Sequence, residues 1–236
     1  MSKDVIIACD FAGKDETLAF LDKFQEEKPF VKIGMELFYA AGPAIVEEIK
    51  KRGHKIFLDL KLHDIPNTVK KTMAVLSKLD ADIVNLHAAG TIPMMEAALE
   101  GLRRPDGTRP LLIAVTQLTS TNEERLHEEL WIDRGMEETV MHYAKNAKKA
   151  GLDGVVCSPL EAGAVHEACG SEFLTVTPGI RFKENAVGDQ ARVMTPFDAR
   201  KIGSDYIVVG RPITAAADPV AAYRRCVAQF VKGVEA

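Results

Sequence analysis

Cysteine is scarce in this chain of 236 residues, and its four copies are far apart. Cys9, Cys157, Cys169 and Cys226 show no CxxC spacing, which argues against a zinc site or a disulfide framework. Two of them lie inside apolar runs. We therefore expect small, buried, reduced thiols, as is usual in a reducing compartment.

Long hydrophobic runs and a strong charge of one sign are also lacking. The apolar run at 5–9 is too short for a signal peptide or a membrane-spanning helix, and no later run is long enough. A net charge of −4 argues against a general binder of nucleic acid or membranes. We expect a cytoplasmic protein that binds any anionic ligand in a local basic pocket.

A third absence concerns glycine. The turn after the first apolar run, residues 10–14, has no GxGxxG pattern, which a dinucleotide-binding sheet would usually carry there. No internal repeat, low-complexity segment or Pro/Gly/Ser-rich linker interrupts the chain. Residues 1–236 are therefore predicted to form a single domain.

Short strand-like runs alternate with longer segments of helical period. The runs cover residues 5–10, 30–35, 55–60, 82–87, 111–116, 153–157, 173–176 and 206–210. Helical spacing of apolar residues is clear at 16–27 and 69–79. Eight such units predict an α/β fold, a single (β/α)₈ TIM barrel with a parallel eight-stranded core. A doubly wound open sheet is the alternative, but it would need fewer strands.

The predicted strands end in polar residues. In a TIM barrel these ends face the active site. The side chains placed there are Asp10, Lys32, Asp59, Lys61, Asn85, His87, Thr116, Gln117, Thr119, Arg181 and Arg211. Structural ion pairs could explain any one of them, but the convergence of several charges favours a functional site.

Two acids bracket one lysine at the end of the third strand. Asp59 and Lys61 are two residues apart and share a face of a strand, and the following turn can bring Asp64 back towards them. Lys32 on the neighbouring strand would extend the chain of alternating charges. Carboxylates beside a lysine favour its protonated form, which can deliver a proton to a carbanion. Because such acids also repel a substrate carboxylate, the cluster suits a decarboxylation.

Phosphate binding is predicted at the ends of the last two strands. Gly210 allows close backbone approach, Arg211 supplies a fork of donors, and a short helix opens after them. The polar loop 179–190, which contains Arg181 and Gln190, is long enough to fold over a ligand as a lid.

These motifs resemble those of the orotidine 5′-phosphate decarboxylase family over nearly the full chain. The motif DLKLHDIPNT at 59–68 is highly specific, and FVKIGME at 30–36, TQLTS at 116–120, TPGIR at 177–181 and VVGR at 208–211 follow in family order. The resemblance implies that Lys61 protonates C6 of the pyrimidine as CO₂ departs, without cofactor or metal. It further implies a network of Lys32, Asp59 and Asp64 around Lys61, ribose contacts from Asp10 and Lys32, pyrimidine contacts near Thr119 and Pro178, and phosphate contacts from Arg181, Gln190, Gly210 and Arg211.

The same resemblance implies a homodimer in which Asp64 and Thr68 reach the partner's site, which conflicts with an Asp64 that folds back within its own chain. Two alternatives stay open. One is a magnesium-dependent sugar-phosphate lyase of the same superfamily, although such enzymes have an acidic metal ligand where this chain has Lys32. The other is a noncatalytic barrel that binds a nucleotide or phosphate for regulation.

Overall fold

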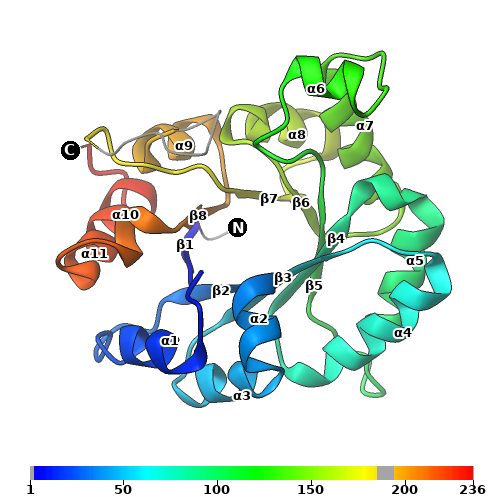
Figure 1. The fold of residues 1–236 in the computed structure, drawn as a ribbon. Coiled ribbons are helices and arrows are strands. Elements are labelled where there is room, and N and C mark those ends of the chain that lie inside the picture. The colour runs from blue at the N-terminus through cyan, green and yellow to red at the C-terminus, as the bar shows by residue number, and fades with distance from the viewer. Residues whose placement is uncertain (1–2, 185–193, 236) are drawn as a thin grey trace.

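The strands close into a barrel. The computed structural model describes residues 3–184 and 194–235. Each of its eight strands pairs in parallel with the next along the chain, and β8 pairs with β1. Helices surround this ring of strands (Figure 1). The predicted (β/α)₈ barrel is thus confirmed, and the open sheet is excluded.

The strand bounds lie within two residues of those predicted. The strands are β1 (Asp4–Ala8), β2 (Phe30–Gly34), β3 (Ile56–Leu62), β4 (Ile83–His87), β5 (Leu111–Val115), β6 (Gly154–Val156), β7 (Leu174–Thr177) and β8 (Tyr206–Val209). The helices are α1 (Lys14–Leu21), α2 (Met35–Ala41), α3 (Ala44–Lys51), α4 (Pro66–Leu76), α5 (Thr91–Leu102), α6 (Glu123–Glu128), α7 (Met136–Lys149), α8 (Ala162–Cys169), α9 (Pro196–Ile202), α10 (Arg211–Thr214) and α11 (Pro219–Phe230).

Both predicted helices end earlier than their apolar spacing indicates. The one expected over 16–27 ends at Leu21, where hydrogen bonds of the tighter i→i−3 type turn the chain. This turn brings Phe24 into the core, with its ring 5.8 Å from that of Tyr223. The one expected over 69–79 is α4, and it gives way to a 3₁₀ turn at Ser77–Leu79. The packing of Phe24 accounts for the first of these two ends.

Alternate strand residues point into and out of the barrel. Ile6, Phe30 and Phe57 belong to the cluster inside the ring, whereas Val31 and Ile33 pack outwards against the helices. This alternation directs Lys32 and Asp59 into the barrel, next to the apolar cluster that contains Phe30 and Phe57. The apolar cluster fills the barrel interior below the two charged groups, which lie at its C-terminal end.

The cysteines and the helix lengths bear on two further expectations from composition. All four cysteines are buried and carry free thiols, as predicted. Within residues 3–184 and 194–235, no helix has the length and apolar character needed to cross a membrane.

An aspartate precedes three of the strands at the opposite, N-terminal end of the barrel, and all three act in the same way. Each aspartate exchanges two hydrogen bonds with one residue of the preceding strand. Its backbone N–H donates to the carbonyl of that strand residue, and its carboxylate accepts the backbone N–H of the same strand residue. The carboxylate bonds are Asp82 to Ile56 at 2.7 Å, Asp153 to Leu112 at 2.7 Å and Asp205 to Thr175 at 2.9 Å. These bonds satisfy strand-end donors that would otherwise be unpaired.

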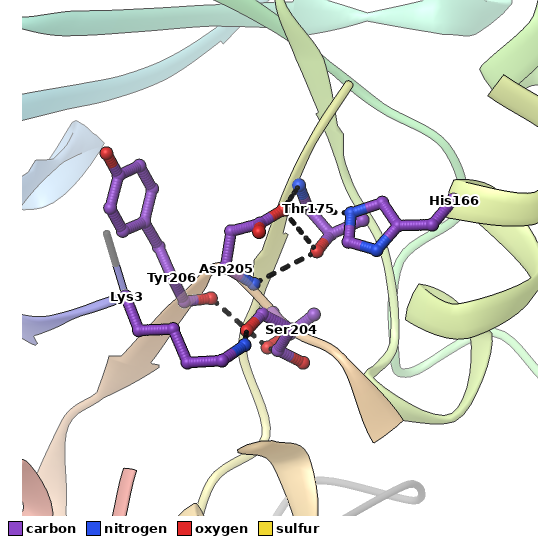
Figure 2. Close-up of polar contacts among 7 residues, drawn as sticks. Lys3, His166, Thr175, Ser204, Asp205 and Tyr206 are labelled. Atoms are coloured by element: carbon purple, nitrogen blue, oxygen red, sulfur yellow. Dashed lines mark hydrogen bonds and ion pairs between the residues drawn. The ribbon is translucent and has the colours of Figure 1, made fainter. Parts of the chain in front are cut away.

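Asp205 is the most enclosed of these aspartates. Its Oδ2 lies 2.9 Å from Nε2 of His166 on α8 and also accepts a 3.0 Å hydrogen bond from the Thr175 hydroxyl (Figure 2). The residue is only 7% exposed. It joins β7, β8 and α8 on the face of the barrel away from the charged cluster, where TIM barrels place stabilising interactions.

We expect Asp205→Ala to lower the free energy of unfolding by about 3 kcal/mol, because it leaves buried donors without an acceptor. Urea unfolding at a fixed protein concentration measures the loss. Asp133→Ala, at an exposed aspartate, is the control and should change stability by less than about 0.5 kcal/mol. A loss from Asp205→Ala as small as that of the control would show that the network contributes little.

Candidate active site

The end of β3 departs from a regular strand where the acids and the lysine lie. Between Leu58 and Leu62 the pairing with β4 shifts, so that this part of β3 bulges. Lys61 takes a φ of 51°, in the left-handed region that non-glycine residues rarely adopt. Its N–H donates to Oδ1 of Asn85 at 2.8 Å, a side chain on β4. The prediction that Asp59 and Lys61 lie together is confirmed, but a bulge and an amide, rather than strand alternation alone, position them.

The bulge completes a line of opposite charges within one chain. Nζ of Lys61 donates to Asp59 Oδ1 at 2.6 Å, and Nζ of Lys32 lies 3.3 Å from Asp59 Oδ2. Lys32 also donates to Oδ1 of Asp10 at 2.9 Å. The order is therefore Asp10, Lys32, Asp59, Lys61, which joins the ends of β1, β2 and β3.

Burial and charge act in opposite directions on the middle of this line. Burial alone would lower the pKa of Lys32, but the neighbouring carboxylates of Asp59 and Asp10 outweigh it and raise that pKa above its ordinary value. Burial alone would raise the pKa of Asp59, but the Lys32 and Lys61 ammoniums and the Asn85 amide lower it. Both groups are thus held in their charged forms beneath the open end of the barrel.

Two residues of this site do not follow from the sequence pattern. The sequence marks Asn85 only as a polar strand end, yet its buried amide donates to Asp59 Oδ1 at 2.6 Å and accepts the Lys61 N–H. The role of Gly34 has no sequence signal. A Cβ at Gly34 would lie 3.1 Å from Nζ of Lys32 and 3.2 Å from Oδ1 of Asp10, so a side chain there would crowd the ion pair. The register between β3 and β4, which the sequence does not specify, brings Asn85 to Asp59 and Lys61.

Asp64 lies apart from this line, contrary to the expectation that the turn after β3 folds it back. Its side chain is exposed and Oδ1 accepts the N–H of Ile65 at 2.6 Å. None of the ion pairs among the described residues joins it to Lys61. Thr68, in the first turn of α4, is also exposed. Within one chain, neither side chain joins the line from Asp10 to Lys61.

Two of the four residues predicted to bind phosphate, Arg181 and Arg211, lie around one cavity of about 550 Å³. Arg211 begins α10, directly after Gly210 at the end of β8, and Arg181 follows β7. Both arginines line the cavity. Gln190 and the part of the predicted lid at 185–190 lie outside the described residues. Arginines that follow β7 and β8 therefore line one opening, as expected.

Two further residues predicted to bind substrate occupy the same end of the barrel. Thr119 is half-buried in the segment after β5, and Pro178 is half-buried directly after β7. Thr116, also noted as a polar strand end, is buried, and its hydroxyl donates to the Val156 carbonyl at 2.9 Å. That hydroxyl joins β5 to β6.

Across residues 3–184 and 194–235, no group of three or more histidine, cysteine, aspartate or glutamate side chains is arranged to hold a metal ion. In the charged line itself, Lys32 occupies the β2 position between Asp10 and Asp59. An ammonium there would repel a divalent cation.

Comparison with known proteins agrees with these observations. Residues 3–226 match the model of the Orotidine 5′-phosphate decarboxylase / HUMPS family. Curated relatives named orotidine 5′-phosphate decarboxylase include those from Bacillus caldolyticus, 60% identical over 95% of this chain and 93% of the relative, and from Geobacillus sp. (strain WCH70), 58% identical over 95% of each.

Solved structures give the same result. An orotidine 5′-phosphate decarboxylase from Lactobacillus acidophilus has a TM-score of 0.87 and 42% identity, covering 97% of this chain and 99% of that one. An uncharacterized conserved protein from Geobacillus kaustophilus has a TM-score of 0.86 and 53% identity, covering 96% and 99%. The chain therefore belongs to the Orotidine 5′-phosphate decarboxylase / HUMPS family.

Proposed function

We propose that this protein converts orotidine 5′-phosphate to uridine 5′-phosphate and CO₂, a step of pyrimidine nucleotide synthesis, without cofactor or metal. The observation that carries the proposal is the line Asp10, Lys32, Asp59, Lys61 at the open end of the barrel. Relatives 57–60% identical bear the decarboxylase name. Because the matched family also includes other enzymes, Lys32 in place of an acidic metal ligand favours this activity over a magnesium-dependent lyase.

The reaction breaks the bond between C6 of the pyrimidine and its carboxylate. The electron pair stays on C6 as CO₂ leaves, and the Lys61 ammonium donates the proton that forms the new C6–H bond. Asp59 holds this ammonium through a 2.6 Å hydrogen bond. The developing carbanion lies beside a fixed positive charge that needs no reorganisation, which stabilises the transition state.

The carboxylates have a second role in the proposal. Asp59 has a side chain only 9% exposed, so little water screens its charge. A substrate carboxylate placed beside it is repelled, and departure as neutral CO₂ relieves that repulsion. The remaining proposed contacts are Asp10 and Lys32 to ribose, Thr119 and Pro178 near the pyrimidine, and Arg181, Gln190, Gly210 and Arg211 to phosphate.

A second copy of the chain would complete this site. Asp64 and Thr68 belong to a segment, 63–68, in which every residue is exposed, and Ile65 within it is 67% exposed. Tyr39 on α2 is 72% exposed. Exposed apolar side chains beside charged ones are typical of an interface. In the proposed homodimer, the partner copy's Asp64 and Thr68 enter the site that contains Lys61.

The activity is tested by following the loss of orotidine 5′-phosphate absorbance after addition of purified protein in the presence of EDTA. Conversion to uridine 5′-phosphate that EDTA leaves unchanged supports the proposal. No conversion with EDTA, but turnover of a sugar phosphate on addition of Mg²⁺, would assign the metal-dependent lyase instead. Binding of nucleotide or phosphate with no turnover of either would assign a noncatalytic barrel.

Removal of the Arg211 guanidinium should weaken phosphate binding. We expect Arg211→Ala to lower kcat/KM for orotidine 5′-phosphate by about 10²-fold, because a charge-assisted contact to phosphate is lost. Part of this loss should appear in kcat, since binding energy remote from C6 helps to hold the carboxylate among the acids. Steady-state kinetics measure both constants. An unchanged KM for the variant would contradict the phosphate role of Arg211.

A further inference from the structure

A third arginine lies in the cavity that contains Arg181 and Arg211. Arg225, on α11, lines this cavity together with Phe182 and Glu184. Its guanidinium carbon lies 4.0 Å from the centre of the Phe182 ring, and its two terminal nitrogens pair with the two carboxylate oxygens of Glu184. Arg225 thus holds two residues of the segment that follows Arg181.

The helix that carries Arg225 is a firm support. Tyr223, Cys226 and Phe230 on the same helix are buried in the core, and Asp218 caps its N-terminus by accepting the N–H of Ala221 at 2.9 Å. The helix packs against both α10 and β1. In Figure 1 α10 and α11 lie together beside β1 and β8. A contact to Arg225 therefore ties a segment to the barrel wall.

The segment with Arg181 makes contacts on both sides that hold it in place. The Arg181 N–H donates to the Met194 carbonyl at 3.0 Å, and the Met194 N–H donates to the Gly179 carbonyl at 3.1 Å. On the other side, Phe182 is 6% exposed beneath the guanidinium of Arg225. A stacked guanidinium held by a carboxylate fixes both position and orientation. The backbone of Arg181 is thus held between a strand-like pairing and the Arg225 clamp.

Arg225 differs from the two arginines proposed to bind phosphate because a carboxylate neutralises its charge. The Glu184 carboxylate neutralises Arg225, and the guanidinium of Arg225 in turn lowers the pKa of Glu184. Two of the five N–H donors of the Arg225 guanidinium are used by Glu184, and one face of the group lies on the Phe182 ring. Its geometry suits support of a neighbour better than a direct phosphate contact.

We infer that Arg225 is a positioning residue for phosphate recognition: by clamping Phe182 and Glu184 against α11, it keeps Arg181 at the cavity that Arg211 also lines. This inference rests on the proposed function, because it assigns Arg225 to the phosphate end of that same site. It adds a residue from outside the strand-end motifs to the recognition of the 5′-phosphate.

The test compares two adjacent arginines on one helix. Arg225→Ala should lower kcat/KM for orotidine 5′-phosphate by about tenfold and leave kcat/KM for orotidine, the same nucleoside without phosphate, within about twofold. Arg224 pairs with Glu26 and Glu27 on the surface and is not among the residues lining the cavity, so Arg224→Ala should change neither value. An equal loss on both substrates, or equal behaviour of the two variants, would overturn the inference.

Two further variants separate positioning from direct contact. If Arg225 acts through Arg181, then Arg225→Ala added to Arg181→Ala should cause little further loss, whereas a direct phosphate ligand would give independent, additive losses. Glu184→Gln should weaken phosphate-dependent turnover, because it loosens the clamp. A gain from Glu184→Gln would show that the freed Arg225 binds phosphate itself. A wild-type protein that converts no orotidine 5′-phosphate would instead refute the proposed function.

Discussion

Replacement of Lys61 with alanine should lower kcat by about 10⁴-fold or more while the variant still binds uridine 5′-phosphate within about tenfold of the wild type. In the proposed mechanism, the variant loses both the proton donor and the positive charge beside the developing carbanion. The product has no carboxylate at C6 and does not need that charge for binding. Stopped or continuous absorbance assays measure kcat, and calorimetry measures product affinity.

The fold should survive this change, which makes the loss interpretable. Asp59 keeps Lys32 at 3.3 Å and the Asn85 amide at 2.6 Å, so its buried carboxylate is not left unpaired. The alanine still has a Cβ, and the left-handed backbone at position 61 keeps the same steric cost. Lys51→Ala, which removes an exposed lysine paired with Glu47, is the control and should leave kcat unchanged. Substantial activity in Lys61→Ala would refute the proton-donor role.

Most of the fold was predictable because its strand signals are local. Each predicted strand is a short apolar run bounded by polar residues, and a barrel strand buried on both faces gives that pattern. The helix at 16–27 was placed wrongly at its end. Whether the chain turns after Leu21 depends on where Phe24 finds a partner, Tyr223, which lies far away in the sequence.

The candidate site was predictable only in part, for a similar reason. The strand-end rule placed Lys32, Asp59 and Lys61 together from strand order alone, and their ion pairs follow. The rule says nothing of a bulge, which depends on the register between two strands, so the hydrogen bonds of Asn85 were not anticipated. Nor does it say whether the turn after β3 folds back, so the exposed position of Asp64 does not follow from the rule.

The position of Asp64 leads to the sharpest test of the proposed homodimer. We expect Lys61→Ala and Asp64→Asn each to be nearly inactive as pure proteins. A mixed dimer of the two, co-expressed with different tags and purified through both, should have about half of the wild-type activity per dimer, because one of its two sites combines an intact Lys61 with the partner copy's intact Asp64.

This recovery has a definite meaning because the two arrangements give opposite results. If Asp64 served its own chain, every site of the mixed dimer would lack either Lys61 or Asp64, and no activity would return. A dimer of two differently tagged Lys61→Ala chains controls for contaminating wild-type enzyme. Full activity in Asp64→Asn alone would remove Asp64 from the reaction, and a chain that stays monomeric would refute the shared site. Since Asp64 is exposed and takes part in none of the ion pairs among residues 3–184 and 194–235, recovery is the expected outcome.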